Sequence, residues 1–413
     1  MLSYVPMSET LLDNFVYLDY PATTPCDPRV FEKMSPYFCK LFGNPHSASY
    51  ALGWASNDAV EVAYAQIADF LNVDKQEIIF TSGATESNLI ALRGVMTSRQ
   101  KTEQNHLITT QTEHKSTLTC CKQLENEGFN VTYLPVNSDG LIDLDELSRS
   151  ITEQTRIVSV VAVNNETGVI QPMEQIGQIC LERNVLFHTD ATQALGKIPI
   201  DFQKWNVALA SFSAHKVYGP KGIGALYIRK KPPVKLRPVQ IGGGQQRGVR
   251  GGTIPVPLCV GFGEACRLLQ EEFHSDLARI SHLSNRLLTG LQTNDPLARL
   301  NGSSQNKVPH IVNIGFPFVE GESIAMGMEN ICVSTGSACS SDQLEASHVL
   351  KAMHVDDIHV QSSIRFGLGR FTSDDDVDYT IKKTTTAVQR LREMSPLWDM
   401  YKNGIDLKTI KWK

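Results

Sequence analysis

The chain has 413 residues, of which 41% are hydrophobic and 20% are charged, and its formal net charge at pH 7 is -5. A chain of this length and composition is expected to form two or three globular domains. The mild negative charge excludes a general attraction to nucleic acid or to anionic membranes, so no direct nucleic-acid partner is expected. No apolar run approaches the length that spans a bilayer, so no membrane association is expected.

The cysteines and the first residues bear on the cellular compartment. The 9 cysteines are an odd number without a Cys-x-x-Cys pair, and no secretory signal is visible. A disulfide framework is therefore not expected, and a reducing cytoplasm fits best. Residues 1–15 contain Glu9 and Asp13 and no arginine, which argues against an arginine-rich transit peptide.

Between about residues 61 and 229, amphipathic helical patterns alternate with short apolar runs. This alternation indicates an α/β fold with a mostly parallel sheet wrapped by helices. The glycine-rich segment from Gly242 to Thr253 is expected to be an extended loop that closes the large domain. Helical patterns resume from Leu258 to about Gln292, and strands near 310–316 and 363–367 indicate a smaller α+β domain. The strands expected in the first region cover residues 77–80, 106–109, 156–163, 185–188, 207–212 and 224–228.

A lysine and an aspartate follow two of these strands. Lys216 comes after the apolar run 207–212, and a lysine amine at the carboxyl end of a buried strand can form a Schiff base. Asp190 follows the run 185–187, and its carboxylate can keep a pyridine nitrogen protonated. Alone, such a lysine is usually a surface residue and such an aspartate a helix cap. Because ligands of open α/β sheets bind at strand ends, the two together predict a pyridoxal-phosphate site.

The turn from Phe80 to Asn88 leads from a strand into a helix and is rich in small polar residues. Backbone N–H groups at a helix N-terminus attract anions, and Ser and Thr hydroxyls add donors. The turn is therefore predicted to hold the cofactor phosphate, with a plain capping box as the alternative.

Other polar residues follow or interrupt the expected strands. His114 would enter the same cleft, where an imidazole can stack on the cofactor and move protons; a surface residue is the alternative. Asn165 ends another strand, where its amide would bond the ring hydroxyl or a substrate carboxylate unless it simply makes a turn. Arg365 lies inside an apolar strand, which suits a carboxylate clamp or an internal ion pair.

Three further features of the sequence involve cysteines or basic residues. Cys339 lies in the run of small residues Ser334–Ser341, and a thiol on a mobile tether suits a carrier of a transferable group. Vicinal Cys120 and Cys121 are expected to be buried on a helix rather than to bind a metal. The basic run Arg229–Arg237 is expected to be an exposed loop, either a solvated face or a patch for partners.

Together these residues resemble the bacterial and mitochondrial cysteine desulfurases, which supply sulfur for iron–sulfur cluster assembly. The similarity extends from Tyr17-Leu18-Asp19-Tyr20 to Ser395-Pro396-Leu397-Trp398 and the tail Gly404–Trp412. It implies a pyridoxal-phosphate-dependent transferase of fold type I, with a mostly parallel seven-stranded sheet in a large domain over residues 24–270. Residues 1–23 with 271–413 would form a small domain that contains the catalytic cysteine loop and a partner-binding tail.

The resemblance also implies roles for individual residues. Lys216 would be the cofactor-binding lysine, Asp190 would pair with the pyridinium nitrogen, and Gln193 would bond the ring oxygen. His114 would stack on the ring and serve in acid–base steps. Asn165 and Arg365 would bind the substrate carboxylate. The phosphate would be held by Ala84, Thr85, Ser213 and His215, together with Thr253 from the other subunit of a homodimer.

The implied activity is the removal of sulfur from L-cysteine, which yields L-alanine and a persulfide on Cys339. An ordinary thiol has a pKa near about 8.5 and is only slightly ionised at neutral pH, so a base such as His114 is expected to assist. The sulfur would go to a scaffold protein in a heterotetramer, with Cys339 as a transient 2Fe-2S ligand, and to acceptors in tRNA thiolation and cofactor synthesis. Frataxin-like or ferredoxin proteins would dock on Arg229–Arg237.

The chain resembles the class with the longer cysteine loop, but it departs from the family after the cysteine. Family members commonly have Thr-Ser-Ala-Ser-Leu-Glu-Pro there, whereas this chain has Ser340-Ser341-Asp342-Gln343-Leu344-Glu345-Ala346. Loss of the proline is expected to loosen the loop, and Asp342 adds a negative charge near the thiol. The expected location is a bacterial cytoplasm, with a mitochondrial matrix as the alternative.

Two other functions compete with this interpretation. A related fold type I enzyme, such as a selenocysteine lyase or an aminotransferase, would share the lysine and aspartate, but an aminotransferase would not need Cys339. A catalytically silent scaffold subunit would be marked by loss of Lys216 or Cys339, and both residues are present.

Overall fold

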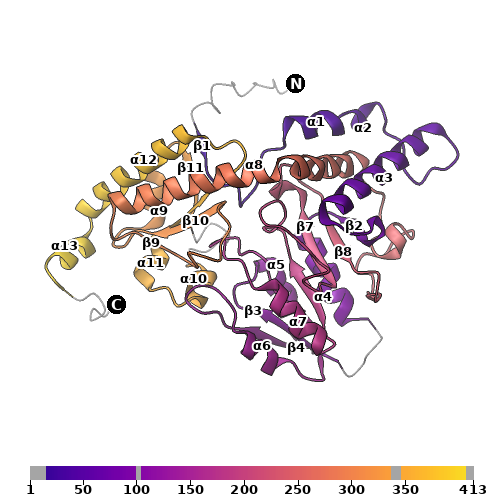
Figure 1. The fold of residues 1–413 in the computed structure, drawn as a ribbon, viewed down its shortest axis with the longest axis horizontal. Coiled ribbons are helices and arrows are strands. Elements are labelled where there is room, and N and C mark those ends of the chain that lie inside the picture. Colours follow the sequence, from indigo (N-terminus) through magenta and orange to yellow (C-terminus); the bar gives the residue numbers. More distant parts are fainter. Residues whose placement is uncertain (1–14, 99–103, 336–345, 406–413) are drawn as a thin grey trace.

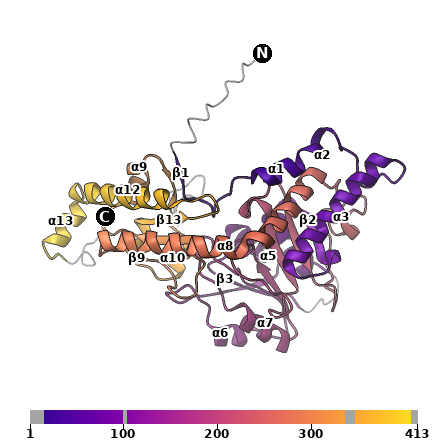
Figure 2. The same ribbon diagram turned by 45° about the horizontal axis from the view of Figure 1, so that its top comes forward.

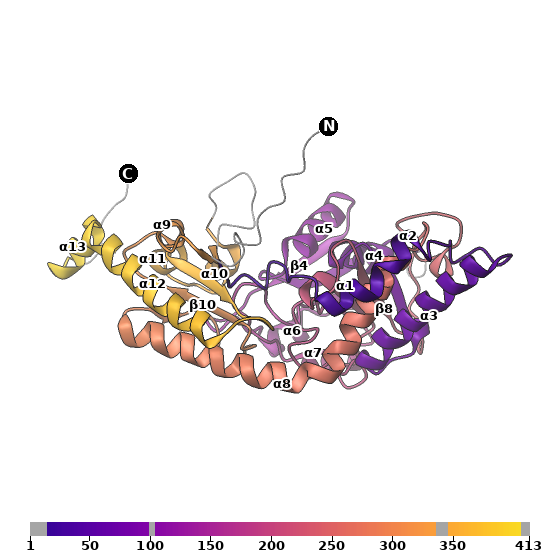
Figure 3. The ribbon, with the colours of Figure 1, turned by 90° about the horizontal axis from the view of Figure 1, so that it is seen from above.

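The computed structural model describes residues 15–98, 104–335 and 346–405, which form a large α/β part and a smaller α+β part. Helix α8 (Val256–Asn294) extends along both parts (Figure 1). Seen from above in Figure 3, α8 runs from α3 (Ala51–Leu71) to α12 (Asp374–Glu393), and both helices pack against it. The long helix predicted over residues 258–292 is therefore confirmed. Within the described ranges, no helix combines the length and the apolar character needed to cross a membrane.

A sheet of seven strands forms the centre of the large part. Neighbouring strands from β7 to β4 are parallel, whereas β8 is antiparallel to both β7 and β2. The predicted α/β fold with a mostly parallel sheet is confirmed. The spatial order is β2 (Ile78–Thr81), β8 (Gly224–Ile228), β7 (Leu209–Ser213), β6 (Leu186–Asp190), β5 (Thr155–Ser159), β3 (His106–Thr110) and β4 (Asn130–Leu134).

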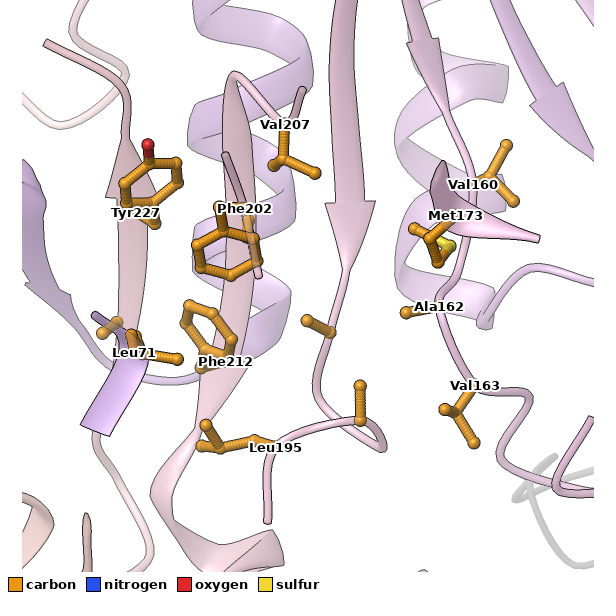
Figure 4. Close-up of a cluster of buried hydrophobic side chains, with 14 of the residues drawn as sticks. Leu71, Val160, Ala162, Val163, Met173, Leu195, Phe202, Val207, Phe212 and Tyr227 are labelled. Atoms are coloured by element: carbon orange, nitrogen blue, oxygen red, sulfur yellow. The ribbon is translucent and has the colours of Figure 1, made fainter. Parts of the chain in front are cut away.

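Helices cover both faces of this sheet, because successive strand residues point to opposite sides and are apolar on both. On one face Ile78 and Phe80 join the core formed with α3, α7 and α8. On the other face Ile79 packs with residues of α4 and α5. Figure 4 shows part of the first core, where the Phe202 ring lies 4.7 Å from that of Tyr227. The helices of this part not yet given are α1 (Pro28–Met34), α2 (Pro36–Cys39), α4 (Ala84–Met96), α5 (Lys115–Asn126), α6 (Leu144–Ser150) and α7 (Met173–Glu182).

The smaller part contains an antiparallel sheet with its own apolar core around Leu18, Leu287 and Phe366. Its order is β12 (Ser334–Thr335), β13 (Ser363–Gly367), β10 (Ile311–Gly315) and β9 (Arg299–Leu300). Strand β1 (Val16–Tyr17) pairs with β11 (Ile331–Cys332), so the start of the described chain lies in this part. The domain division at residues 24 and 270 stays a prediction, since α8 crosses residue 270 without a break. The short helices here are α9 (Gly321–Gly327), α10 (His348–Ala352), α11 (Asp357–Gln361) and α13 (Pro396–Lys402).

Helix α12 shows how local sequence sets an element. It begins at a capping box between Ser373 and Asp376, with three acidic residues in its first turn and two arginines in its last. The acidic residues stabilise the positive N-terminal end of the helix dipole, and the arginines stabilise its negative C-terminal end. Figure 2 shows α12 lying beside α8, against which it packs.

The glycine-rich segment 242–253 contains one short 3-10 turn (Gln246–Gly248) and otherwise neither helix nor strand, as predicted. The buried Gln246 side chain accepts from the backbone N–H of Phe80 (2.6 Å) and donates to its carbonyl (2.7 Å). The loop therefore satisfies the outer backbone groups of β2, at the edge of the large sheet.

Candidate active site

A cavity of about 810 Å³ lies where the parallel strands of the large sheet end, and residues of the smaller part complete its wall. Thr253 is not among the lining residues, and its side chain is exposed in its own chain. Cys339 lies outside the described residues. The structure brings the other predicted residues together, since the lining includes Ala84, Thr85, His114, Asn165, Asp190, Gln193, Ser213, His215, Lys216 and Arg365.

Lys216 lies in a 3-10 turn (Ala214–Lys216) directly after β7. Its Nζ donates to the carbonyl oxygens of Pro21 and Ala22, both at 2.6 Å. A side chain at Gly219 would meet the Ala214 carbonyl at 2.9 Å, so the tight turn after the lysine needs glycine. The amine therefore lies at the cavity wall, held by two backbone acceptors.

Asp190 ends β6 and is 4% exposed. One carboxylate oxygen accepts from Asn88 Nδ2 (2.8 Å) and the other from the Thr192 backbone N–H (3.0 Å). No lysine, arginine or histidine forms an ion pair with it in the described part of the chain. A nearly buried carboxylate without a cation suits a positively charged ligand group.

His114 is the N-cap of α5, and its Nδ1 accepts from the Ser116 backbone N–H (3.1 Å). The Ser116 hydroxyl also lies 2.8 Å from Nδ1 and accepts from Asn88 Nδ2 at 3.1 Å. Because Nδ1 is an acceptor, the neutral ring has its proton on Nε2. Desolvation by the surrounding protein lowers the pKa of His114, and the charge of Lys216 lowers it further, although Asp190 opposes both. The ring is therefore neutral at pH 7.

Glu113, next to this histidine, is fully buried. Its Oε1 accepts from the Val161 backbone N–H (2.7 Å) and from Thr110 Oγ1 (3.0 Å), while Oε2 has no hydrogen-bond partner. Burial raises the pKa of this carboxyl to about 8. Glu113 is therefore a neutral acid at pH 7 that ties the β3–α5 connection to the segment after β5.

The N-terminus of α4 lies at the cavity, and its N-cap residue Gly83 provides no side-chain cap. The first-turn N–H groups of Ala84 and Thr85 are therefore available to an anion. Across the cavity wall, His215 Nδ1 lies 3.1 Å from Thr23 Oγ1. Burial, then the charge of Lys216, lowers the pKa of His215 to about 4. This part of the cavity presents mostly neutral hydrogen-bonding groups.

Arg365 lies on β13 and is 5% exposed. Its guanidinium donates to the Asn165 carbonyl (2.9 Å), to Asp19 Oδ1 (2.7 Å) and to Ser334 Oγ (2.9 Å). The internal ion pair considered as the alternative is thus present. Nε has no hydrogen-bond partner, which leaves a buried donor on a residue that lines the cavity.

The donor set fits pyridoxal phosphate. An amine, a carboxylate without a cation and a helix N-terminus without a cap line one cavity, and these suit an aldehyde, a ring nitrogen and a phosphate. The buried Thr192 hydroxyl, also in the lining, has no partner within the described chain and is a further donor for a ligand.

Sequence reasoning missed several residues of this site, above all Asn88, Glu113 and Lys197. The first of these is 102 positions away from Asp190, to which it donates. A single sequence gives no signal for such a pairing. The Lys197 Nζ donates to Gln193, and the only sequence signal for this contact was the spacing of four residues between the two.

Two other sequence features lie away from the cavity. Cys120 and Cys121 are buried on α5, and burial raises the pKa of Cys120 to about 11, as suits unreactive core thiols. Among the residues that the structure describes, no group of three or more His, Cys, Asp or Glu could hold a metal ion. Most residues of the run 229–237 are exposed, as predicted for a loop.

Known proteins resemble this chain closely. The family Aminotransferase class-V matches residues 16–380. A cysteine desulfurase of Rattus norvegicus is 52% identical over 410 residues, which cover 99% of this chain and 91% of the relative. A mitochondrial cysteine desulfurase of Eremothecium gossypii is 53% identical over 397 residues, covering 96% of this chain and 81% of the relative. The solved structure of a NifS-like protein has a TM-score of 0.85 and 38% identity, and the match covers 91% of this chain and 100% of that one.

Proposed function

The chain belongs to the cysteine desulfurases of the aminotransferase class-V family, pyridoxal-phosphate-dependent enzymes that remove sulfur from L-cysteine, and we propose which of its residues perform this reaction. The observation that supports the assignment is the single cavity lined by Lys216, Asp190, His114 and Arg365. Each comes from a different element, and together they supply an amine, an anion, an imidazole and a carboxylate ligand.

Several residues would hold the cofactor. The Lys216 amine would bind it covalently, Asp190 would pair with its ring nitrogen, and Gln193 would bond its ring oxygen. When bound, pyridoxal phosphate supplies an electron sink for the α-carbon of the substrate. The phosphate is assigned to the N-terminus of α4, to Ser213 and His215, and to Thr253 of a second subunit.

The substrate carboxylate is assigned to Arg365 and Asn165. The free Nε–H of Arg365 is the donor that supports this role, since the other nitrogens already bond Asp19, Ser334 and the Asn165 backbone. Asp19 holds the guanidinium in one orientation, which reduces the entropy lost on binding. His114 exchanges protons with the cavity through Nε2, because Ser116 occupies Nδ1.

Cys339 is the proposed sulfur acceptor. Its thiolate forms a bond to the substrate sulfur while the carbon–sulfur bond breaks, and the carbon takes up a proton to become the methyl group of alanine. Cysteine and the enzyme thiol thus give alanine and an enzyme persulfide, and no outside oxidant is needed.

The partners are proposed on family grounds. We expect a homodimer, a scaffold protein that accepts the persulfide sulfur in a heterotetramer, and Cys339 as a transient ligand of the nascent 2Fe-2S cluster. Acidic partners such as frataxin-like or ferredoxin proteins would dock on Arg229–Arg237. A mitochondrial matrix is proposed in place of the bacterial cytoplasm, because a relative named mitochondrial is 53% identical.

The test is the release of alanine and sulfide from L-cysteine with a thiol reductant, measured beside the visible absorbance of the cofactor. The wild-type protein should be yellow and should form both products. Cys339→Ala should keep the colour and form neither, and Lys216→Ala should lose the colour. The half-buried Cys332 offers a matched control, since Cys332→Ala should keep full turnover. Equal alanine formation by Cys339→Ala would remove this cysteine from the mechanism.

A further inference from the structure

Lys197 is a buried lysine close to the cavity, and the sequence analysis assigned no role to it. It is 6% exposed, and its Nζ donates to Gln193 Oε1 at 2.8 Å. Within the described part of the chain, no carboxylate forms an ion pair with it. Lysine is rarely buried without a partner of opposite charge, so this arrangement calls for a physical explanation.

The hydrogen bond from Lys197 fixes the orientation of the Gln193 amide. A protonated lysine amine has donors only, so in this state the amide must turn its oxygen toward Lys197 and its NH2 group the other way. Nε2 then donates one hydrogen to the Pro21 carbonyl at 2.9 Å. The second hydrogen remains available, and Gln193 lines the cavity. The amide therefore offers the cavity a donor rather than an acceptor.

The same lysine adds positive charge near the cavity. Burial, followed by repulsion from Lys216, lowers the pKa of Lys197 to about 7. The charge of Lys197 in turn contributes to the lowered pKa of His215 and of the buried His310. Lys216 and His215 line the cavity, and Lys197 adds its charge from behind Gln193, so an anion bound in the cavity would be stabilised.

The backbone places Lys197 for this contact. Residues 191–198 form successive turns after β6, and Gly196 has a φ of +67°. This left-handed conformation favours glycine at position 196. The turn brings Lys197 back beside Gln193 and away from solvent.

We propose that Lys197 is a positioning residue that locks the Gln193 amide with its N–H toward the cavity, so that it donates to the anionic ring oxygen of the cofactor. This inference rests on the proposed role of Gln193 as the ligand of that oxygen. Without Lys197, the amide can rotate and present its oxygen to the anion, which turns an attraction into a repulsion. Lys197 thus contributes to cofactor binding without touching the cofactor.

The test compares wild-type protein with Lys197→Met, which keeps the length and apolar stem of the side chain but has no donor. The affinity for pyridoxal phosphate, titrated into cofactor-free protein, should fall about tenfold or more. The pH midpoint of the visible absorbance change should rise, because a donor and a positive charge both favour the deprotonated bound cofactor. A purely structural role would lower the unfolding temperature and leave this midpoint unchanged.

A double-mutant cycle tests whether Lys197 acts through the amide. In a Gln193→Ala background, Lys197→Met should cause a much smaller loss of affinity, whereas an equal loss in both backgrounds would overturn the inference. Lys307→Met is the matched control, because desolvation lowers the pKa of Lys307 as well, but among the described residues no hydrogen bond joins its Nζ to a residue of the cavity lining. This variant should bind the cofactor like wild type.

Other outcomes separate this inference from the proposed function. Wild-type affinity and midpoint in Lys197→Met would overturn the inference and leave the desulfurase assignment intact. Wild-type protein that binds no cofactor would instead overturn the assignment itself. Should Lys197→Met fail to fold, Lys197→Gln keeps a donor for Oε1 and should bind the cofactor within about threefold of wild type; a tenfold loss there would contradict the orienting role.

Discussion

At the scale of single residues, Asn88 joins the two groups that bear most directly on the chemistry. Its one Nδ2 atom donates both to Asp190 and to the Ser116 hydroxyl that contacts His114. Asn88→Ala should weaken cofactor binding about fivefold to tenfold, because it leaves a buried carboxylate with one donor fewer. The affinity is measured by titrating pyridoxal phosphate into the cofactor-free protein.

Ser87 supplies the matched control for this change. It is also fully buried on α4, and its hydroxyl donates to the Ala225 carbonyl (3.0 Å), away from Asp190. Ser87→Ala should lower the midpoint of urea unfolding but leave the cofactor affinity unchanged. If both variants lost affinity alike, general damage to α4 rather than the Asn88 contacts would explain the result.

Glu113 predicts how stability changes with pH. Burial raises the pKa of its carboxyl from an ordinary value of 4.5 to about 8, so the folded protein binds this proton more tightly than the unfolded chain does. The resulting stability is complete below the ordinary value and is lost as the pH rises through about 8. Glu113→Gln keeps the shape and the oxygen that accepts from Val161, but it cannot ionise.

The glutamine variant should therefore gain stability over wild type as the pH rises above the ordinary value, by roughly 5 kcal/mol above about pH 8, and should be similar to wild type in acid. Urea unfolding midpoints measured across this pH range test the expectation. Glu153→Gln, at an exposed glutamate, should follow the wild-type curve. Parallel curves for Glu113→Gln and wild type would mean that Glu113 is already ionised in the folded protein.

These residues also mark what the sequence could predict of the site. Lys216, Asp190 and His114 were predictable because each follows an apolar run, and the ends of parallel strands meet at one edge of a sheet. Asn88, Glu113 and Lys197 were not, because their importance depends on partners and burial that only the folded chain defines.

At the scale of elements, strand β4 is the clear omission from the sequence prediction. Its residues Asn130–Leu134 are mostly half-buried or exposed at the edge of the sheet, and an edge strand lacks the continuous apolar run of a central one. The antiparallel direction of β8 was likewise not predictable from its apolar residues, because hydrophobic periodicity is the same in both directions. The central strands, buried on both faces, were found within a few residues.

Arg370 connects several elements and predicts a large loss of stability. It follows β13 and bonds Asp27 at the start of α1 (2.9 Å) and Asp276 on α8 (2.9 Å), with its guanidinium 4.5 Å from the Tyr218 ring centre. Its side chain is 8% exposed. Arg370→Met should cost about 3 kcal/mol of unfolding free energy, because Asp276 loses its ion-pair partner and the buried Asp27 keeps only the half-exposed Arg29.

Arg286→Met is the comparison for this prediction. Arg286 also bonds two carboxylates, those of Asp374 and Asp378, but its side chain is 40% exposed. Solvent screens such pairs, so the loss should be below about 1 kcal/mol in the same urea titration. Similar losses of unfolding free energy for the two variants would show that the contacts of Arg370 with Asp27 and Asp276 do not stabilise the packing of β13, α1 and α8.

At the scale of the whole molecule, a single chain exposes large apolar side chains on its N-terminal helices and next to the glycine-rich loop. Phe31 is 60% exposed, Trp54 is 55% exposed, and Ile241, twelve residues before Thr253, is 89% exposed. Large apolar side chains with this much exposure suit a surface that another protein covers. The proposed homodimer would cover such side chains and would let Thr253 reach the second subunit's cavity.

A mixing experiment tests that arrangement. Lys216→Ala chains and Thr253→Ala chains should each have little activity alone, since each homodimer lacks one group at both sites. In a mixed dimer, the chain with an intact Lys216 would receive an intact Thr253 from its partner, so one of the two sites would be complete. Random mixing should therefore restore roughly a quarter of wild-type alanine formation, because about half of the dimers are mixed. No recovery, in a mixture shown to exchange subunits, would mean that Thr253 serves its own chain or neither.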